Sequence, residues 1–525
     1  MHFISDLFDF FVERRDEILT QTIEHIWITF LSLTIAAAVG ISLGVMLTRQ
    51  RRLAQPVLGF VNIVQTIPSL ALLGFLLPLF GIGVTPAIIA LFLYGLLPIV
   101  RNTYTGIQEV ESSVLEAARG MGMSDRQILT KVELPLATPT IFAGIRTAVV
   151  INIGIATLCA FIAAGGLGEF IFRGIALNNV TMIMAGAIPA SLLALFFDAI
   201  LGILQKHIGQ VIRPVLVGFG VVLVFMVGYL IANQQASHVL AGFNSEFMER
   251  EDGYPGLKAV YKLDGLDVVE MEINLMYQAL HNGKVDIISG FSTDGRIDAY
   301  NFRVLEDDKR YFPPYYAAPL VRGDALRRYP ELSVIFEKIA GQISEEAIRN
   351  MNYQVDAGQS SPRVVAKEFL ESIGIKTLPK KSGAPHVVVG SKSFTENFIL
   401  AELFALLIES ESDLTVELKQ GFGGTKLLFE ALKSGGVDLY PEYTGTGLLV
   451  LLQPEEDVIR KLIGSKERVY DYVKKASKEN FDLVWMQPLG FNNTTALMMQ
   501  EKKAEQWGIQ TISDLQEYLL GRKAD

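Results

Sequence analysis

The sequence predicts a protein of two parts, an α-helical membrane domain with six spans followed by an α/β domain of two lobes. Of the 525 residues, 50% are hydrophobic and only 19% are charged, which is too apolar for a water-soluble protein. Residues 1–236 hold 13 of the 46 Lys and Arg and 13 of the 56 Asp and Glu, so their charges cancel. Residues 237–525 therefore carry the whole net charge of −10, and they alternate helical and strand-like patterns.

This composition excludes a disordered chain, a nucleic-acid binder driven by overall positive charge, and a purely soluble enzyme. The single cysteine, Cys159, excludes a disulfide framework and a cysteine metal cluster. The six histidines show no ligand spacing, so we expect no metal site.

Residues 1–22 mix aromatic and charged side chains and predict an N-terminal amphipathic segment. Phe10 and Phe11 are followed directly by Arg14 and Arg15, a pattern unlike a cleavable signal peptide. Two interpretations remain open: a helix lying in the membrane interface, or the solvated end of an ordinary helix.

Six apolar stretches predict the membrane domain, residues 23–233. Each is near the ~20 residues with which a helix crosses a bilayer. They cover residues 26–47, 57–78, 85–100, 141–163, 181–204 and 215–232. Arg146 and Asp198 lie inside two stretches but close to their predicted cytoplasmic ends, where snorkelling of the side chains accounts for them.

The basic residues of the loops predict that both termini lie outside the cytoplasm. The loops 48–56, 101–140 and 205–214 hold nine Lys and Arg, whereas the outer segments before the α/β part hold three. Loops rich in Lys and Arg stay on the cytoplasmic side. We therefore expect residues 237–525 on the opposite face of the membrane.

The loop at 101–140 contains a motif with a defined spacing. Its residues are Glu116, Ala117, Ala118, Gly122, Leu134 and Pro135. The motif resembles the coupling loop of bacterial ABC importer permeases, which docks on a cytoplasmic ATPase. Small alanines allow close approach, Gly122 permits a sharp turn, and Pro135 should keep the next helix from starting early. The alternative is an arbitrary amphipathic loop helix.

Two longer stretches resemble the permeases that take up osmoprotectants or quaternary amines. They are "QTIPSLALLGFLLPLFGIG" (65–83) and "GLLPIVRNTYTG" (95–106). The resemblance implies a MetI-like permease of a type I ABC importer in the bacterial cytoplasmic membrane, working as a homodimer. No phosphate-binding G-x-x-x-x-G-K-[ST] motif occurs, so ATP is expected on a separate ATPase subunit and this chain is expected to hold no cofactor.

Two near-repeats indicate two similar lobes in residues 237–525. "QALHNGKVDIISGFSTD" (278–294) and "EALKSGGVDLYPEYTGT" (430–446) each read as a helix, a turn and a buried strand. Such pairs of α/β units are typical of binding proteins that hold a ligand between lobes.

Further motifs resemble the substrate-binding proteins for glycine betaine, carnitine, choline and related solutes. They are "GFNSEF" (242–247), "FSTDGRI" (291–297), "FPPYYAAP" (312–319), "GSKSFTEN" (390–397), "YPEYTGT" (440–446) and "GFNNTTAL" (490–497). The resemblance implies a type II periplasmic-binding-protein-like fold fused to the permease.

The order of these motifs differs from the order usual in the family, where the GSKSFTEN half comes first. We therefore predict a circular permutation. Residues 373–390, rich in Pro, Lys and Gly, would join the usual chain ends.

The resemblance also implies the ligand site. A trimethylammonium group cannot donate a hydrogen bond, so aromatic rings hold it by cation–π attraction. The implied cage rings are Phe291, Tyr315 and Tyr443, and the implied carboxylate contacts are Arg250, Lys392 and Thr446. Asn493 and Thr494 would line the cleft, and Asp294 would add a polar contact.

One departure from the family concerns Thr495, which stands where the family has a further cage tyrosine. A wider cage suggests a ligand larger than glycine betaine, for which ergothioneine is a candidate. Carnitine, choline and proline betaine remain open.

The sequence thus predicts a non-enzymatic ABC transporter subunit that imports betaine-class compounds. A membrane-anchored sensor is the alternative, although a sensor would not need the motif at Glu116. A membrane-anchored enzyme is disfavoured because no activated nucleophile or metal cluster is evident.

Overall fold

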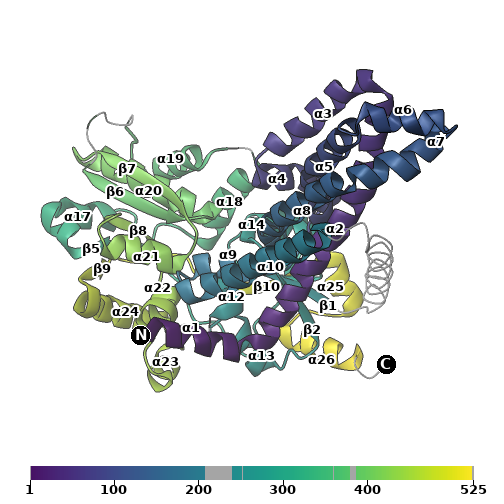
Figure 1. The fold of residues 1–525 in the computed structure, drawn as a ribbon. Coiled ribbons are helices and arrows are strands. Elements are labelled where there is room, and N and C mark those ends of the chain that lie inside the picture. Colours follow the sequence, from purple (N-terminus) through teal and green to yellow (C-terminus); the bar gives the residue numbers. More distant parts are fainter. Residues whose placement is uncertain are drawn as a thin grey trace. The chain divides into compact units, whose positions relative to one another are not determined.

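The computed structural model describes residues 2–206, 239–250, 252–358, 360–378, 383 and 386–522. The chain divides into two compact units (Figure 1), Met1–Gly174 with Val180–Ser237 and Ile175–Asn179 with His238–Asp525. We call them the helical unit and the α/β unit.

Ten helices precede residue 207 in the described chain (Figure 1). They are α1 (His2–Glu13), α2 (Arg15–Arg49), α3 (Arg51–Thr66), α4 (Ser69–Phe80), α5 (Val84–Gln108), α6 (Ser112–Gly120), α7 (Asp125–Ile128), α8 (Leu134–Cys159), α9 (Gly168–Ala176) and α10 (Val180–Lys206). A π-helical turn, Leu129–Glu133, joins α7 to α8, and a 3-10 turn, Ala160–Ile162, follows α8.

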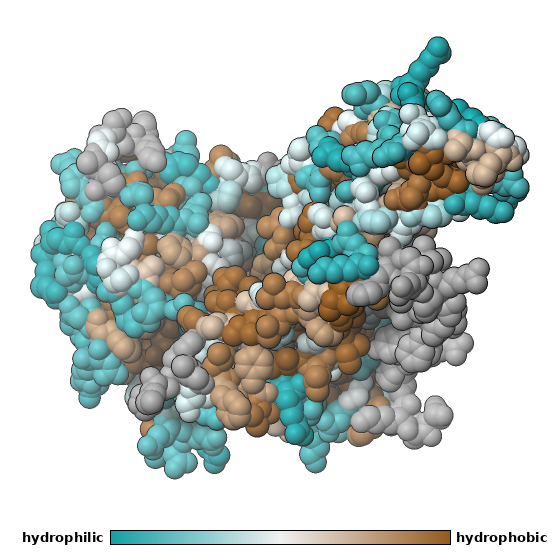
Figure 2. All heavy atoms as spheres, viewed as in Figure 1, coloured by the Kyte–Doolittle hydropathy of each residue, from teal (hydrophilic) through white to brown (hydrophobic). Residues whose placement is uncertain are grey.

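Among the described residues, four continuous helical segments are long and apolar enough to cross a membrane, and they contain most of the predicted spans. They are Arg15–Arg49, Val84–Gln108, Asp125–Ile162 and Val180–Lys206. Apolar side chains cover the middle of the helical unit, and hydrophilic ones gather around α6 and α7 (Figure 2). The predicted sixth span, 215–232, lies outside the described residues.

The predicted second span, 57–78, is wrong as a single helix. The structure has α3 and α4 there, bent by 98° at the break between them. Ile67 is extended (φ −66°, ψ 130°) and precedes Pro68. Since proline disfavours the helical conformation of the residue before it, the chain turns at this point.

The described parts of the loops predicted to be cytoplasmic lie together at one end of the helical unit. Arg49 at the end of α2 donates to Glu133 in the π-helical turn over 3.1 Å. Gln205 at the end of α10 donates to the carbonyl oxygen of Pro139 near the start of α8 over 3.0 Å. The described basic residues of these loops are therefore gathered at the same end, and Arg213 lies outside the described residues.

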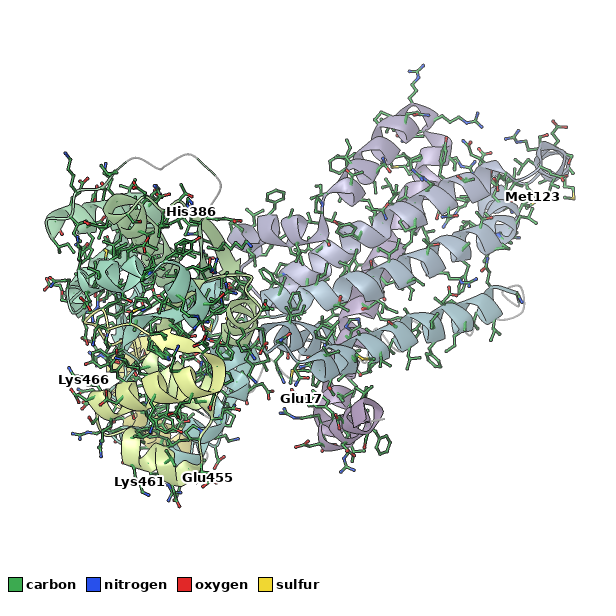
Figure 3. All side chains as sticks on the ribbon, turned by 90° about the vertical axis from the view of Figure 1, so that its left-hand side faces the viewer. Glu17, Met123, His386, Glu455, Lys461 and Lys466 are labelled. Atoms are coloured by element: carbon green, nitrogen blue, oxygen red, sulfur yellow. The ribbon has the colours of Figure 1, made fainter. Side chains whose placement is uncertain are left out.

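The opposite end carries a different ion pair. Arg173 of α9 donates to Glu17 of α2 over 2.7 Å. Figure 3 shows Glu17 at this end and Met123, in the loop after α6, at the other. The two ends of the helical unit thus differ in their content of basic residues.

Snorkelling is not needed to explain the two charges within spans. Arg146 of α8 donates through Nη2 to Asp198 of α10 over 2.6 Å, and its Nε also donates to this carboxylate. The paired charges compensate each other in a membrane-spanning segment.

The α/β unit contains two five-stranded sheets, one in each lobe. Lobe A has the strand order β2-β1-β3-β10-β4, and lobe B has β7-β6-β8-β5-β9. The strands are β1 (Val239–Phe243), β2 (Leu266–Glu270), β3 (Ile287–Phe291), β4 (Phe302–Val304), β5 (Ala317–Arg322), β6 (Val387–Lys392), β7 (Val416–Phe422), β8 (Leu439–Tyr443), β9 (Leu483–Trp485) and β10 (Thr495–Gln500).

Helices pack on both sheets (Figure 1). Those of lobe A are α12 (Ser245–Glu249), α13 (Tyr254–Tyr261), α14 (Ile273–His281), α15 (Arg296–Tyr300), α25 (Glu501–Trp507) and α26 (Ile512–Arg522). Those of lobe B are α16 (Gly323–Arg328), α17 (Glu331–Glu337), α18 (Glu345–Asp356), α19 (Pro362–Ser372), α20 (Thr395–Glu411), α21 (Thr425–Lys433), α22 (Thr444–Thr446), α23 (Glu456–Leu462) and α24 (Lys466–Phe481), with a π-helical turn at Gly447–Leu452.

The near-repeats of the sequence occupy equivalent places in the two sheets. β3 and β8 each lie third in their sheet, beside β1 and β6, respectively. The aspartate just before each strand accepts a hydrogen bond from the neighbouring strand. Asp286 accepts from the amide of Leu240 over 2.8 Å, and Asp438 accepts from the amide of Val388 over 2.9 Å. The predicted two-lobed fold is therefore confirmed.

The chain crosses between the lobes twice, after β4 and after β9. In each case the crossing chain leads into an antiparallel strand, β5 or β10, at the fourth place of the other sheet. The crossing segments meet, since Tyr316 and Asn492 form an antiparallel bridge and the amide of Asn493 donates to the carbonyl oxygen of Tyr315 over 3.0 Å. These contacts join the two crossing segments to each other.

The predicted circular permutation stays a prediction, and the topology is compatible with it. Because both sheets have the same strand order, exchanging the two halves of the chain leaves this order unchanged. In the proposed joint, Lys376, Leu378, Gly383 and His386 are exposed. Its residues 379–382, 384 and 385, and the chain ends at 237 and 525, lie outside the described residues.

Candidate functional site

Aromatic rings from both lobes stack where the third strands end. Phe291 ends β3 of lobe A, and Tyr443 ends β8 of lobe B. Phe394, the residue before α20, lies parallel to both, with ring centroids 5.2 Å from Phe291 and 6.4 Å from Tyr443. Two of the three predicted cage rings therefore belong to one aromatic column, and Phe394 is a member that the sequence did not single out.

Tyr315, the third predicted cage ring, lies in the first crossing segment. Its ring packs against Gly445, where a Cβ atom would lie only 2.5 Å from Tyr315 Cδ1. Its hydroxyl donates to Asp252 of lobe A. The glycine in "YPEYTGT" thus makes room for a ring that joins the lobes.

A buried carboxylate, Glu396 of α20, lies beside the column and accepts four hydrogen bonds from uncharged groups. The donors and distances are Thr293 Oγ1 at 2.5 Å, Tyr443 Oη at 2.6 Å, Asn493 Nδ2 at 2.8 Å and Asn352 Nδ2 at 3.2 Å. Burial raises the pKa of Glu396, while these donors oppose the rise. The sequence analysis missed this residue, although it lies in the motif "GSKSFTEN".

Lys392, a predicted carboxylate contact, already holds a carboxylate of the chain. Its ammonium group lies 2.7 Å from Glu442 Oε1, and both side chains are buried. The ammonium also lies 5.4 Å from the ring centroid of Tyr443. The positive charge of Lys392 is therefore balanced inside lobe B.

Arg250, the other predicted cationic contact, is balanced in the same way in lobe A. Its Nε donates to Asp252 over 2.8 Å, and Nη1 lies 3.7 Å from Glu246. Burial alone would raise the pKa of Asp252, but the guanidinium outweighs it and holds this pKa below the usual value. Arg250 borders a small open cavity together with Phe291 and Thr495.

A second, narrow cavity also borders Phe291 and gathers two further predicted site residues, Asp294 and Asn493. Asp294 accepts from Arg296 Nε over 2.9 Å and from Nη2 over 2.7 Å. The structure thus brings Phe291, Asp294 and Asn493 together around this cavity.

Five predicted residues border neither cavity. Tyr315 lies in the first crossing segment, and Tyr443, Lys392 and the buried Thr446 belong to lobe B. Thr494 exchanges hydrogen bonds with Ser292 and lines a separate cavity.

In the helical unit, the predicted coupling motif forms α6, a turn and α7. Glu116 and Ala117 are exposed on α6, whereas Ala118 is buried. Gly122 has a φ of +76°, so the predicted turn is present and favours glycine. Ser124 then caps α7 by accepting from the amide of Gln127.

The predicted role of Pro135 is wrong. The helix does not start there, because the chain is helical from Asp125 through the turn Leu129–Glu133 into α8, which begins at Leu134. Proline has no N–H to donate to the usual α-helical hydrogen bond. The π-helical turn just before Pro135 replaces the α-helical hydrogen-bond pattern there, so the helix continues through the proline.

Comparison with known families decides the class of the protein. Residues 231–372 and 385–523 match the family described as the substrate binding domain of ABC-type glycine betaine transport systems. The chain belongs to this family. Residues 36–214 match a second family, the binding-protein-dependent transport system inner membrane component.

Named relatives cover each part of this ABC importer chain. The glycine betaine/carnitine/choline transport system permease protein OpuCB of Bacillus subtilis is 45% identical over 205 residues, which are 39% of this chain and 94% of the relative. The ergothioneine transport permease/ergothioneine binding protein EgtU of Helicobacter pylori is 27% identical over 479 residues, covering 64% of this chain and 87% of the relative.

Among solved structures, the MetNI methionine ABC transporter in an inward-facing form is 25% identical, with a TM-score of 0.33. The match covers 37% of this chain and 95% of that chain.

The chain is thus a membrane protein that joins the permease and the substrate-binding domain of a betaine-class ABC importer. Its families consist of transporter components, and an ABC permease works with an ATPase partner.

Proposed function

We propose that the α/β unit binds a trimethylammonium ligand at Phe291, Tyr443 and Tyr315, together with Phe394. One observation carries this proposal: rings from both lobes converge beside the buried carboxylate of Glu396. Each ring face contributes roughly 0.5–2 kcal/mol to holding a quaternary ammonium. Because the rings come from different lobes, ligand binding favours closure of the lobes.

The carboxylate end of a betaine would meet Lys392, Arg250 and Thr446. Since Glu442 and Asp252 already balance the two cations, the ligand competes with them or takes N–H groups that they leave free. Asn493 and Asp294 would contact the ligand from the second cavity, and Thr494 would line the cleft. Glycine betaine, carnitine, choline, proline betaine and ergothioneine are the candidates.

We also propose that the chain lies in the bacterial inner membrane with the α/β unit on the extracytoplasmic side. The gathering of the described basic residues of these loops at one end of the helical unit supports this orientation. The segment from Glu116 to Pro135 would then face the cytoplasm and dock on the ATPase. Two copies of the chain would form one pathway, with ATP bound only by the partner.

The ligand assignment can be tested by calorimetry on the full chain in lipid nanodiscs. Phe291→Ala and Tyr443→Ala should each weaken trimethylammonium binding by about tenfold or more. Phe429→Ala, which removes a ring from α21 in lobe B, is the control for a general loss of packing. Unchanged affinity in both cage variants would remove these rings from the site.

The coupling assignment can be tested at Gly122. Gly122→Asp places a side chain where φ is +76°, so it should deform the loop and abolish uptake while ligand binding is retained. Gly508→Asp, in the α/β unit with a φ of +69° and nothing within 4 Å of the added Cβ, is the matched control and should keep uptake. Transport that persists in Gly122→Asp would contradict the proposed docking loop.

A further inference from the structure

The helix α3 of the helical unit has three different faces. Ala54 and Val61, seven positions apart, are buried against α2 and α5. Leu53 and Phe60, also seven positions apart, are exposed and apolar. The third face is exposed but polar, and its members recur at intervals of four, three and four positions, which places them on one side of a helix. We call this face the polar stripe; its residues are Gln55, Gly59, Asn62 and Thr66.

The polar stripe ends level with the middle of a membrane-spanning helix. α3 runs beside α5 (Figure 1). The hydroxyl of Tyr94, near the middle of α5, donates to the carbonyl oxygen of Ile67, the residue after α3. At its other end α3 begins at Arg51, next to the basic end of α2. The stripe therefore extends about 16 Å from the basic end inward, roughly half of the hydrocarbon thickness of a bilayer.

Lipid does not suit the polar stripe. Amide groups that face hydrocarbon find no hydrogen-bond partner there, and this costs free energy. The side chains of Gln55 and Asn62 form no hydrogen bond within the described part of the chain. The space over Gly59 is open, because a Cβ atom added there would meet nothing within 4 Å. These groups therefore need a polar environment, whereas Phe60 on the opposite side of α3 suits lipid.

The bend that follows the stripe supports the same conclusion. Thr66 and Pro68 are exposed at the 98° bend between α3 and α4. Thr66 donates through Oγ1 to the carbonyl oxygen of Ile63 over 2.6 Å, so its hydroxyl oxygen can still accept. Non-helical backbone at membrane depth is tolerated only where protein buries it or where it lines a water-filled cavity. Since the bend is exposed in the described chain, a water-filled cavity meets this requirement.

Water explains the stripe better than a second copy of the chain does. Contacts between helices in a membrane favour small residues that let the backbones approach. The stripe instead carries hydrogen-bonding side chains at three levels, from the basic end to the bend, as a continuous passage needs. None of its side chains is charged. A zwitterion or a cation would therefore meet donors and acceptors without a counter-charge that retains it.

We propose that the polar stripe of α3 lines a water-filled passage through which the imported solute moves from the middle of the membrane toward the basic end of the helical unit. Gln55, Asn62 and Thr66 offer it hydrogen bonds on the way. The inference goes beyond the ring site of the α/β unit, because it concerns the helical unit alone and the step after the solute has left the binding domain.

Thiol labelling of the full chain in nanodiscs tests for water along α3. The single cysteine, Cys159, is buried, so the unmodified chain should react slowly. The probe is 2-(trimethylammonium)ethyl methanethiosulfonate, a water-soluble cation. Asn62→Cys and Thr66→Cys should react with it about tenfold or more faster than Phe60→Cys, because only the thiolate reacts and an apolar environment disfavours the thiolate. Phe60→Cys is the matched control, since it lies two positions from Asn62 on the opposite, exposed face.

Uptake tests whether the solute uses this passage. Asn62→Leu keeps the approximate size of the side chain but removes its hydrogen-bonding groups. It should lower uptake about tenfold and leave ligand binding by the full chain unchanged. Asn62→Gln retains the amide and should keep most of the uptake. Phe60→Leu, on the apolar face, is the control and should transport normally.

The outcomes separate this inference from the proposed ring site. Labelling at positions 62 and 66 as slow as at position 60 would overturn the water-filled passage. So would a disulfide between two copies of Asn62→Cys that forms while the probe fails to react, because the stripe would then be a contact between copies. Normal uptake in Asn62→Leu would overturn the role in transport. None of these results depends on the rings, which the affinities of Phe291→Ala and Tyr443→Ala test.

Discussion

Two groups of buried charges in the α/β unit are arranged in opposite ways. In the first, which we call the matched pairs, Lys392 lies against Glu442 and Arg250 against Asp252. In the second, which we call the acceptor cluster, Glu396 and Asp356 lie with Asn352 and Asn493, and the donors of Glu396 are all uncharged.

The difference shows which charge the binding cleft offers to a ligand. The positive groups predicted to hold a carboxylate are already compensated, so their net attraction for an anion is reduced. The acceptor cluster has only Arg296 as a nearby cation for Asp356, and it keeps unpaired acceptors next to the aromatic column. The cleft is therefore better suited to the cationic end of a ligand than to its anionic end.

The largest effect is expected from Glu396→Gln, which removes the negative charge beside the column. Ligand affinity should fall on the order of 100-fold, the factor that about 3 kcal/mol of charge attraction represents. Calorimetry with glycine betaine measures it. Glu411→Gln, at the other end of α20, is the control and should bind normally. A fall of less than threefold in Glu396→Gln would show that this carboxylate does not act on the ligand.

Within the matched pairs, removing the acid should harm folding. Glu442→Gln leaves the buried ammonium of Lys392 without its counter-ion, and this should destabilise the protein by about 3–5 kcal/mol. Thermal and denaturant unfolding of the full chain measure the loss. Glu456→Gln breaks an exposed pair with Arg460 and should cost well under 1 kcal/mol. A similar small cost at both sites would erase the distinction between matched and exposed pairs.

Within the acceptor cluster, removing an acid should stabilise the folded protein rather than destabilise it. Burial, together with the charge of Asp294 and against that of Arg296, raises the pKa of Asp356 to about 6. The folded protein therefore binds a proton more tightly than the unfolded chain, and this group costs stability as the pH rises from about 4 through 6. Asp356→Asn should raise stability by about 1–3 kcal/mol at pH 7.5.

The pH dependence provides the check on that prediction. The advantage of Asp356→Asn should shrink as the pH falls below 6 and be largely lost by about pH 3, where the wild-type carboxyl is mostly protonated in both states. Unfolding curves of both proteins between pH 3 and 8 measure it. An advantage that does not change with pH would assign the effect to packing rather than to the charge.

Much of the fold could be predicted because its signals are local. The spans show as runs of apolar residues, and the two lobes show in the repeated helix–turn–strand segments at 278–294 and 430–446. The break at Pro68 was missed because the apolar run continues through it, although the proline itself was a usable signal. At Pro135 the error was the opposite one, because a helix start was expected to be delayed where the helix in fact continues. The π-helical turn that accommodates this proline has no evident sequence signature.

The candidate site was predictable only in part. Motifs identified Phe291 and Tyr443, but nothing local indicates that Glu442 neutralises Lys392, because this pair joins strands 50 positions apart. Glu396 escaped attention because an acid in the first turn of a helix usually serves as a favourable helix-end charge. Its role depends on donors from both lobes, which only the fold brings together.

The central claim is that the cleft recognises a quaternary ammonium by its charge. The most direct test compares glycine betaine with 3,3-dimethylbutanoate, which has the same shape and carboxylate but a carbon in place of the charged nitrogen. Calorimetry on the full chain in nanodiscs should show binding of the carbon analogue to be weaker by on the order of 100-fold or undetectable. Equal affinity for the two compounds would contradict the account.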